Sequence, residues 1–216
     1  MEALLVTGGE APPRSRLGPR LGGFGLICAA DSGLDTLASW DVEPQLIVGD
    51  MDSISSRALL DRYPRARLII APRAKDETDT ELGLAALEHG GAARIVLAGG
   101  GGGRLDHLLA IRAIFERRAG PRPSEWHTAR EAVYLVEEGG SISLEAAPNS
   151  TVSVFPLAAG ARGMSSAGLA WPLEGLAWGP GDCGVSNVAV EGSFCVGVGR
   201  GELLVVLSLE ADEGRG

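Results

Sequence analysis

The sequence predicts an α/β protein, with an N-terminal Rossmann-like three-layer domain built on a parallel sheet and a small antiparallel β-sandwich or barrel domain after it. Two observations support this prediction. In the first part of the chain, continuous apolar runs alternate with helix-like segments, which is typical of parallel strands covered by helices on both faces. Beyond residue 130, short strand-like segments follow one another between Gly, Pro, Asn and Ser with no helical pattern between them.

The elements are assigned from these runs. In the first domain we expect strands at residues 3–6, 25–30, 45–48, 67–70 and 94–98, and helices at residues 32–40, 55–63, 76–89 and 105–118. In the second domain we expect strands at residues 133–137, 141–145, 151–156, 188–190, 194–198 and 203–209. The polar, proline-bearing segment 121–130 marks the boundary, so the predicted domains are residues 1–128 and 129–216.

Composition narrows the class of partner. The 216 residues carry a formal net charge of −9, so no basic footprint for nucleic acid or an anionic membrane is expected. The three cysteines, Cys28, Cys183 and Cys195, form no C-x-x-C pair, which argues against a zinc site or a disulfide framework. The N-terminus does not resemble a signal peptide, and no apolar run is long enough to span a bilayer. We therefore expect a cytoplasmic location.

Two acidic motifs follow the second and third expected strands. Asp31 stands directly after residues 25–30, where it can line a site or simply cap the next helix. Asp50 and Asp52 follow residues 45–48, and two carboxylates two residues apart can converge on one hard cation. The alternative for this pair is a solvated turn.

Two more motifs stand at expected helix starts. Asp76 and Asp79 are three residues apart and share a helix face, although carboxylates at a helix N-terminus can also serve only as caps. The glycine run 99–103 precedes Arg104, Asp106 and His107. Main-chain N–H groups of such a run can approach phosphate closely and an arginine adds a forked donor, whereas the alternative is a flexible loop.

Carboxyl ends of parallel strands share one sheet edge, so these motifs are expected to form an acidic metal cage beside an anion cradle. An acidic protein binds a polyanion such as ATP through a divalent cation. The P-loop, the dinucleotide-binding glycine motif and the protein-kinase motifs are absent from the sequence. The residues alone therefore indicate metal-assisted phosphoryl or nucleotidyl transfer.

The motifs also resemble those of one enzyme family. The segments ADSGLDTL, PQLIVGDMDSI, KDETDTELGLAAL, GGGGGRLDHLLA and GLAWPLEGLAWGPGDCGVSN are similar to motifs of the thiamine pyrophosphokinases (thiamine diphosphokinases), from about Ala30 to Leu207. The chain departs from the family pattern at Ser32, where Gly is usual, and at Val188, where Glu is frequent.

This resemblance implies a homodimer that transfers a diphosphoryl group from ATP to the hydroxyl of thiamine, with Mg²⁺ as cofactor and AMP as the second product. Residues 1–128 would form the catalytic, ATP- and magnesium-binding domain, and residues 129–216 the thiamine-binding domain. The implied site residues are Asp50, Asp52, Asp76 and Asp79 for the metal and for catalysis; Arg104 and Asp106 for catalysis; Asp31, Gly33, Gly102, Gly103, Arg104 and His107 for the nucleotide; and Trp171, Ser186 and Asn187 for thiamine.

Two other functions remain open. A pyrophosphokinase of another small alcohol, such as a hydroxymethyl-pterin, would use the same acidic motifs. A non-catalytic dimer that binds thiamine or a nucleotide is the second alternative. Trp171 and Trp178 also have an ordinary alternative, as core residues of the β domain.

Overall fold

The computed structural model describes residues 1–51, 54–55, 57–72 and 76–209. The chain divides into two compact units, Met1–Ala129 and Arg130–Gly216. The sequence analysis places this division one residue earlier. The N-terminal sheet with its helices and the antiparallel region after it confirm the predicted mixed α/β fold.

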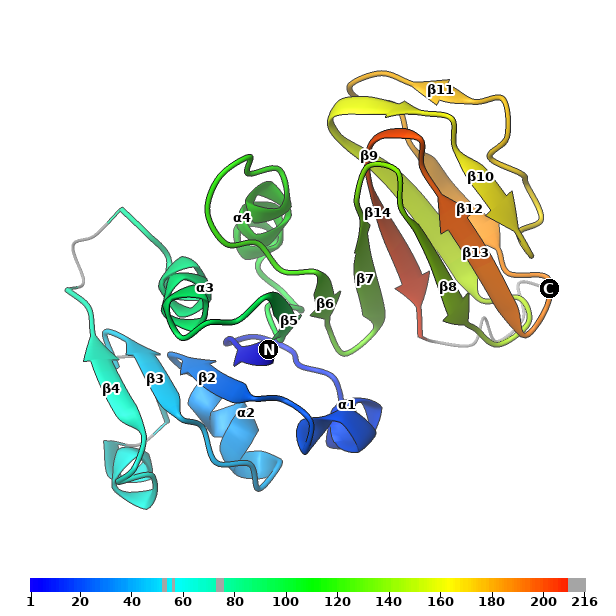
Figure 1. Cartoon of the computed structure of the whole chain (residues 1–216). Coiled ribbons are helices and arrows are strands. Elements are labelled where there is room, and N and C mark those ends of the chain that lie inside the picture. The colour runs from blue at the N-terminus through cyan, green and yellow to red at the C-terminus, as the bar shows by residue number, and fades with distance from the viewer. Residues whose placement is uncertain (52–53, 56, 73–75, 210–216) are drawn as a thin grey trace. The chain divides into compact units, whose positions relative to one another are not determined.

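The first unit is built on a parallel sheet (Figure 1). Its strands are β1 (Glu2–Val6), β2 (Leu26–Ala30), β3 (Leu46–Gly49), β4 (Arg67–Ile70), β5 (Arg94–Ala98) and β6 (Glu125–His127). They lie in the order β6-β5-β1-β2-β3-β4, and every pair is parallel. The strand order reverses between β1 and β5, which is the point where open parallel sheets bind ligands.

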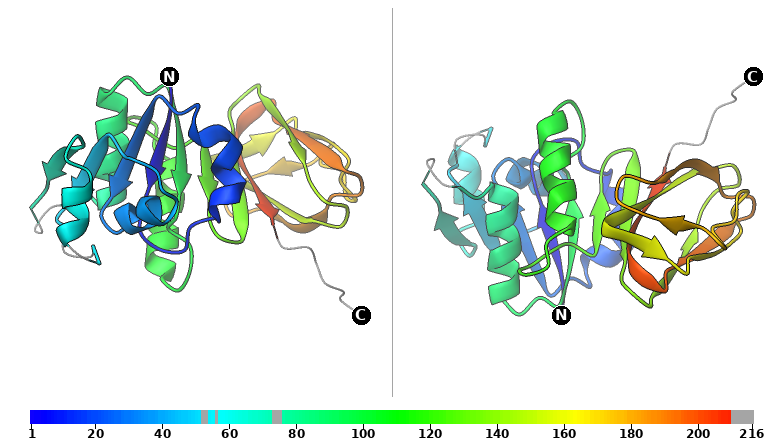
Figure 2. Two further views of the ribbon diagram at one scale, coloured as in Figure 1. Left: turned by 90° about the horizontal axis from the view of Figure 1, so that it is seen from below. Right: turned by 90° about the horizontal axis from the view of Figure 1, so that it is seen from above.

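Helices cover both faces of this sheet (Figure 2). One face carries α1 (Arg14–Leu21), α2 (Gly33–Ser39) and the 3₁₀ helix η1 (Arg57–Arg62), and the other carries α3 (Asp79–His89) and α4 (Leu105–Phe115). Leu17, Leu34 and Leu59 pack from the first set of helices against strand residues such as Leu4. The two covered faces leave β1, β2, β3 and β5 nearly free of solvent, as their continuous apolar sequences predict, whereas the edge strand β4 is mostly exposed.

The second unit is antiparallel. One sheet holds β7 (Glu131–Val136), β9 (Thr151–Arg162), β11 (Ala177–Trp178), β12 (Gly184–Val188) and β14 (Arg200–Ser208), and the other holds β8 (Ser141–Glu145), β10 (Ser165–Ala167) and β13 (Ser193–Gly197). Val154 and Val205 of the first sheet share a core with Phe194 and Val196 of the second. Two antiparallel sheets around one apolar core form a β-sandwich.

Several elements differ from the sequence prediction. Helix α1 was not expected, because Pro13 precedes it and Pro19 lies inside it. Strand β6 lies in the segment assigned to the boundary, although all of its residues are buried. Helix α3 begins at Asp79 because Thr78 caps it. Among the β elements, β10 and β11 were missed, and the strand expected at 188–190 is β12, which ends at Val188.

Candidate functional site

The carboxyl edge of the parallel sheet carries a cleft of about 410 Å³. The loops after β1, β2 and β5 and the first turns of α3 and α4 enclose it. Its lining comes from residues 7–9, 31–32, 79–80, 100–102, 104 and 107. The cleft therefore lies at the reversal of strand order, where the fold predicts a ligand site.

One wall of the cleft is main chain. The N–H of Gly100 donates to the carbonyl oxygen of Gly8 at 2.7 Å, and the N–H of Glu10 donates to Gly101 at 2.9 Å. Glu10 and Gly101 form an antiparallel bridge, so main-chain hydrogen bonds join the loop after β1 to the loop after β5. The glycines of this wall carry no side chains of their own, which suits close approach by a phosphate group, although the side chain of Glu10 lies against Gly102.

Glycine is required where these loops meet. Gly99 has a φ of 98°, and a Cβ atom added there would lie 2.2 Å from the carbonyl oxygen of Thr7. No side chain fits at that distance, and L residues rarely adopt that φ. The glycine run is thus an ordered main-chain wall, and the flexible-loop alternative does not describe its first residue.

Strand β6 supports the base of this wall. The indole Nε1 of Trp126 donates to the carbonyl oxygen of Gly99 at 2.7 Å, and the N–H of Gly99 donates to the carbonyl oxygen of His127 at 3.0 Å. The Nε2 atom of His127 lies 3.0 Å from the carboxylate of Glu125. Both side chains are buried, with 5% and 8% of their surfaces exposed.

Glu125 is the centre of an ionic network. Arg20 donates to it at 2.7 Å and Arg94 at 2.9 Å. Burial by itself would raise the pKa of the Glu125 carboxyl, but the hydrogen bonds from His127 and Arg20 outweigh it and hold the pKa at about 2. The network therefore keeps a buried carboxylate charged beneath the glycine wall.

The opposite side of the cleft is acidic. Asp31 and Asp79 both line it. Gly49 lies between them, since a Cβ atom added at Gly49 would lie 3.3 Å from the Cβ of Asp31 and 3.3 Å from Oδ1 of Asp79. Asp31 has a φ of 50°, an uncommon conformation that often marks a functional position. The structure thus brings together two carboxylates that the sequence separates by 48 positions.

Asp79 is held by the start of α3. The side chain of Thr78 accepts a hydrogen bond from the N–H of Glu81, and the carboxylate of Glu81 accepts one from the N–H of Thr78. This reciprocal cap fixes the first turn of the helix. The position at the N-terminus also favours the negative charge of Asp79.

The other predicted metal ligands are placed differently. Asp50 follows β3 at the same sheet edge but does not line the cleft, and Asp76 is exposed. Asp52 lies outside the described residues. Within the described ranges no three His, Cys, Asp or Glu side chains converge on one metal position. The four-carboxylate cage therefore stays a prediction.

Arg104 enters the cleft from the start of α4. Its guanidinium makes a two-point contact with Asp106, with 3.1 Å between Nε and Oδ1. This contact holds the pKa of Asp106 at about 2. Both side chains are about two-thirds exposed, at 68% and 63%, so the pair can exchange partners with a ligand.

The remaining predicted nucleotide-binding residues divide into two groups. His107 and Gly102 line the cleft, whereas Gly103 faces open space. Gly33 packs against β1, where an added Cβ atom would lie 2.0 Å from the carbonyl oxygen of Val6. Its place explains close packing of α2 on the sheet and indicates no contact with a ligand.

The predicted thiamine residues lie together in the second unit. Trp171 is 61% exposed, so it is not a core residue. The buried amide of Asn187 is hydrogen-bonded to both main-chain groups of Trp171. Ser186 is exposed and has a φ of 60°. Trp178, by contrast, packs against the apolar core of this unit.

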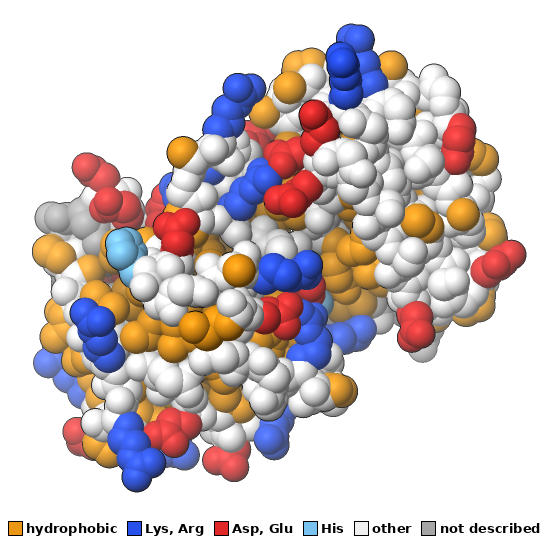
Figure 3. All heavy atoms as spheres, in the orientation of Figure 1, with side chains coloured by type: hydrophobic (Ala, Val, Ile, Leu, Met, Phe, Trp, Pro, Cys, Tyr) orange, Lys and Arg blue, Asp and Glu red, His pale blue; other side chains and the backbone are white. Residues whose placement is uncertain are grey.

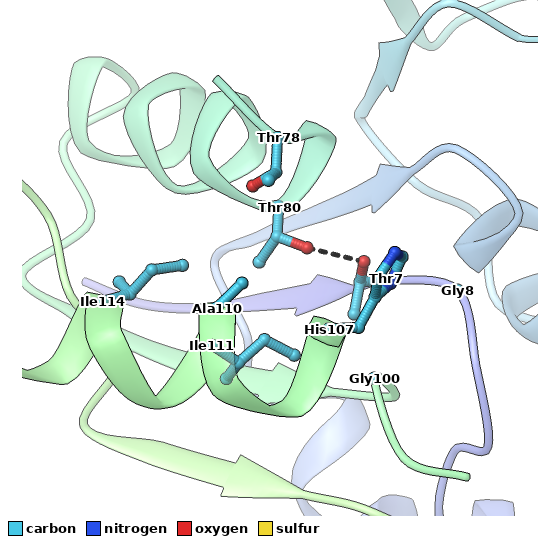
Figure 4. Close-up of a pocket in the computed structure, with 9 residues that line it drawn as sticks. All are labelled: Thr7, Gly8, Thr78, Thr80, Gly100, His107, Ala110, Ile111 and Ile114. Atoms are coloured by element: carbon cyan, nitrogen blue, oxygen red, sulfur yellow. Dashed lines mark hydrogen bonds between the residues drawn. The ribbon is translucent and has the colours of Figure 1, made fainter. Parts of the chain in front are cut away.

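The loop after β1 was not predicted as part of the site. Thr7, Gly8 and Gly9 line the cleft, and so does Thr80. A threonine and two glycines directly after the first apolar run were the available signal. Thr7 and Thr80 also border a smaller hollow of about 40 Å³, between α3 and the Ala110 and Ile111 side chains of α4 (Figure 4).

The charged surface agrees with the acidic composition. On the face drawn in Figure 3, basic side chains alternate with acidic ones in each unit and form no continuous basic patch. In the part of the chain that is described, no helix has both the length and the apolar character to cross a membrane.

The fold defines an α/β protein with a cleft at the carboxyl edge of a parallel sheet, where such folds bind ligands, followed by a β-sandwich. Residues 23–118 match the family model described as thiamin pyrophosphokinase, catalytic domain. The domain at residues 23–118 therefore belongs to the thiamin pyrophosphokinase family, which confirms the resemblance seen in its motifs. No curated protein matches the chain at a significant level.

Solved structures share the fold over nearly the whole length. A thiamine pyrophosphokinase from Bacillus subtilis has a TM-score of 0.79 at 21% identity, covering 98% of this chain and 100% of that one. A thiamin pyrophosphokinase family protein from Enterococcus faecalis has a TM-score of 0.76 at 23% identity, covering 98% and 100%. A thiamin pyrophosphokinase from Candida albicans has a TM-score of 0.69 at 19% identity, covering 97% and 90%.

Proposed function

We propose that the protein transfers a diphosphoryl group from ATP to the hydroxyl of thiamine, giving thiamine diphosphate and AMP. One observation carries the proposal. The domain that matches the catalytic family model has a cleft with a main-chain wall on one side and Asp31, Asp79 and Arg104 around it. That combination suits a polyphosphate whose charge is met by N–H donors, an arginine and a metal ion.

The proposed reaction is an in-line displacement at phosphorus. The thiamine hydroxyl oxygen attacks the β-phosphorus of ATP in line, a new oxygen–phosphorus bond forms, and the bond from the β-phosphorus to the bridging oxygen breaks. AMP leaves with that bridging oxygen. A carboxylate of the cleft takes the hydroxyl proton. Arg104 holds the phosphate oxygens together with main-chain N–H groups of the cleft other than those of Gly99, Gly100 and Gly101, which donate within the protein, so the chain contributes mainly positioning and charge stabilisation.

Magnesium fits the donor set. Mg²⁺ in phosphoryl-transfer sites is held by one or two carboxylates together with phosphate oxygens. Asp31 and Asp79, which approach each other across Gly49, supply two hard oxygen ligands for it. The bound ion would neutralise charge on the phosphates.

Thiamine and a second copy of the chain are assigned to the β-sandwich unit. Its exposed apolar side chains include Trp171, Leu176, Val185 and Val190. A tryptophan face attracts the permanent cation of the thiazolium ring, and an acidic protein favours a cationic substrate. A homodimer would cover part of this apolar surface, and light scattering on the purified protein measures it. A monomer that is active at low concentration would contradict the dimer.

The test is one incubation with ATP, Mg²⁺ and thiamine, read by mass spectrometry. Thiamine diphosphate with AMP supports the proposal. Thiamine monophosphate with ADP would show attack on the γ-phosphorus instead. No product from thiamine, but diphosphoryl transfer to a hydroxymethyl-pterin, would reassign the acceptor.

The substitution Asp79→Asn tests whether the reaction takes place in the cleft. We expect kcat to fall by about a hundredfold or more, because a ligand of the metal and its charge are lost. Asp61→Asn is the matched control, since Asp61 lies exposed on η1 and away from the cleft. Equal activity of the two variants would remove Asp79 from the mechanism.

A further inference from the structure

We propose that Asn187 is a positioning residue for Trp171, and that it affects thiamine binding through that indole without contacting the substrate. The inference rests on the proposed function, since thiamine is taken as the ligand of the exposed tryptophan. It changes the role that the family resemblance implies for Asn187, from a substrate contact to a support of one.

The side chain of Asn187 clasps the main chain of Trp171. Its Nδ2 donates to the carbonyl oxygen of Trp171 at 2.7 Å, and its Oδ1 accepts from the N–H of Trp171 at 3.1 Å. A primary amide presents a donor and an acceptor side by side, as a peptide group does. The side chain therefore pairs with Trp171 in the way a neighbouring strand would.

This clasp extends an existing pairing. Leu169 forms an antiparallel bridge with Ala189, and the N–H of Ala170 donates to the carbonyl oxygen of Val188 at 2.9 Å. The next pair along would be Trp171 with Asn187. At that position the main chain of β12 is already paired with β9, where Asn187 stands opposite Val152. The side chain of Asn187 supplies the missing partner.

A β-bulge aims the residues beside the clasp. Between Gly184 and Asn187 the register of β12 against β9 shifts, leaving one extra residue on β12. Val185 and Ser186 occupy this bulge, both exposed, and Ser186 has a φ of 60°. The hydroxyl of Ser153 accepts the N–H of Ser186 at 3.2 Å. Bulges often re-aim side chains next to ligand sites.

Asn187 has little capacity left for a substrate. Its Oδ1 accepts from the N–H groups of both Trp171 and Val188, the second at 2.8 Å, so both acceptor positions are used. One N–H of the amide is bonded to Trp171, and the residue is 6% exposed. Trp171 is 61% exposed, so the indole is the group that a ligand can reach.

The chemistry of the amide gives a discriminating substitution. Asn187→Asp keeps the shape and the acceptor but replaces the donor with an oxygen that faces the carbonyl of Trp171. The variant loses the buried hydrogen bond from Nδ2 to the carbonyl oxygen of Trp171, and the indole is then no longer held in place. We therefore expect the KM for thiamine to rise about tenfold. The kcat and the KM for ATP should stay within about threefold. Asn149→Asp, at an exposed turn of the same unit with a φ of 67°, controls for the added charge.

A double-mutant cycle with Trp171→Ala shows whether Asn187 supports Trp171 or contacts thiamine itself. If Asn187 acts through Trp171, the double variant has the thiamine KM of Trp171→Ala alone. If Asn187 contacts thiamine directly, the two increases in KM multiply, and the proposal is overturned. Asn187→Ser, which leaves room for a bridging water, repeats the cycle should the aspartate variant fail to fold.

Hydrogen exchange at the Trp171 amide tests the clasp without any substrate. Asn187→Ala removes the oxygen that accepts from the N–H of Trp171, so it should speed this exchange in the free protein, and an unchanged rate would overturn the clasp. A wild-type protein that turns over thiamine, with multiplied KM effects, overturns this inference alone. A wild-type protein that gives no thiamine product overturns the proposed function and this inference with it.

Discussion

The side-chain hydroxyls of Thr7 and Thr80 lie 2.8 Å apart, although 73 positions separate them in the sequence (Figure 4). Both residues are buried, at 7% and 9% exposure. Thr7 follows β1 and Thr80 belongs to the first turn of α3. Their hydrogen bond therefore joins the main-chain wall of the cleft to the helix that carries Asp79.

The effects of removing the two hydroxyls on stability should not add. Thr80→Val leaves the hydroxyl of Thr7 without this partner, and we expect the free energy of unfolding to fall by about 1–3 kcal/mol. Thr7→Val should have a similar effect. The double variant should lose less than the sum, because neither hydroxyl is then left in an apolar contact. Denaturant unfolding of the three variants measures this, and strict additivity would show that the hydroxyls do not interact.

Two alanine substitutions in the glycine run should behave differently. Gly99→Ala places a Cβ atom 2.2 Å from the carbonyl oxygen of Thr7, at a φ of 98°, so the wall must distort. Gly103→Ala meets nothing within 4 Å at a φ of 43°. We expect Gly99→Ala to raise the KM for ATP by tenfold or more, roughly, and to lower the melting temperature. The matched Gly103→Ala has the unfavourable φ without the clash, so its KM for ATP should stay within about threefold of wild type, and similar KM values for both variants would contradict an ordered wall.

Substitution of Arg104 should change the KM for ATP and leave the KM for thiamine unchanged. Its forked guanidinium suits phosphate oxygens, so Arg104→Gln should raise the KM for ATP by about tenfold, and Arg104→Lys by less. The KM for thiamine should be unchanged. Arg118→Gln, at an exposed position beyond the end of α4, is the control for a lost positive charge. Steady-state kinetics with each substrate varied in turn test this, and a selective change in the KM for thiamine would refute it.

The buried carboxylate of Glu125 should make stability depend on acid pH. Its pKa of about 2 in the folded protein lies below the ordinary value of 4.5, so the stabilisation is complete above pH 4.5 and is lost as the pH falls toward 2. Arg20, Arg94, Glu2 and His127 belong to the same network.

Glu125→Gln should therefore lower the melting temperature at neutral pH by about 5 °C and flatten its fall between pH 4.5 and 2. Glu88→Gln, at an exposed position of α3, should keep the wild-type pH profile. Thermal unfolding across this range compares the variants. A Glu125→Gln protein that keeps the full acid dependence would assign it to other carboxyls.

The fold was predictable where one apolar run makes one buried strand. β1, β2, β3 and β5 match the expected runs closely because each is buried between two layers of helices, and β4 matches its run although it is an exposed strand at the edge of the sheet. Helix α1 was missed because Pro13 and Pro19 argue against a helix, although Pro13 lies at the position before the first turn, which tolerates proline. β6 was missed because its three buried residues stand in a polar, proline-bearing segment.

The site was predictable where its residues carry charge and at Gly102 of the glycine run, which also lines the cleft. Asp31, Asp79, Arg104 and His107 were expected from the ends of strands and the starts of helices, and the structure places them around one cleft. The hydroxyl pair was not predictable, because it depends on side chains that the fold brings together from distant segments. The hydrogen bonds between the side chain of Asn187 and the main chain of Trp171 were not predictable either, because the sequence does not indicate which group an asparagine will bond to.

The paired loops after β1 and β5 have a consequence for the thermodynamics of binding. Gly8 and Glu10 already hold Gly100 and Gly101 through main-chain hydrogen bonds. A glycine-rich segment would otherwise lose much conformational entropy when a ligand orders it. Because the cradle is ordered before the ligand arrives, that loss belongs to folding and not to association. A preorganised cradle leaves more of the interaction energy with the phosphates available as affinity.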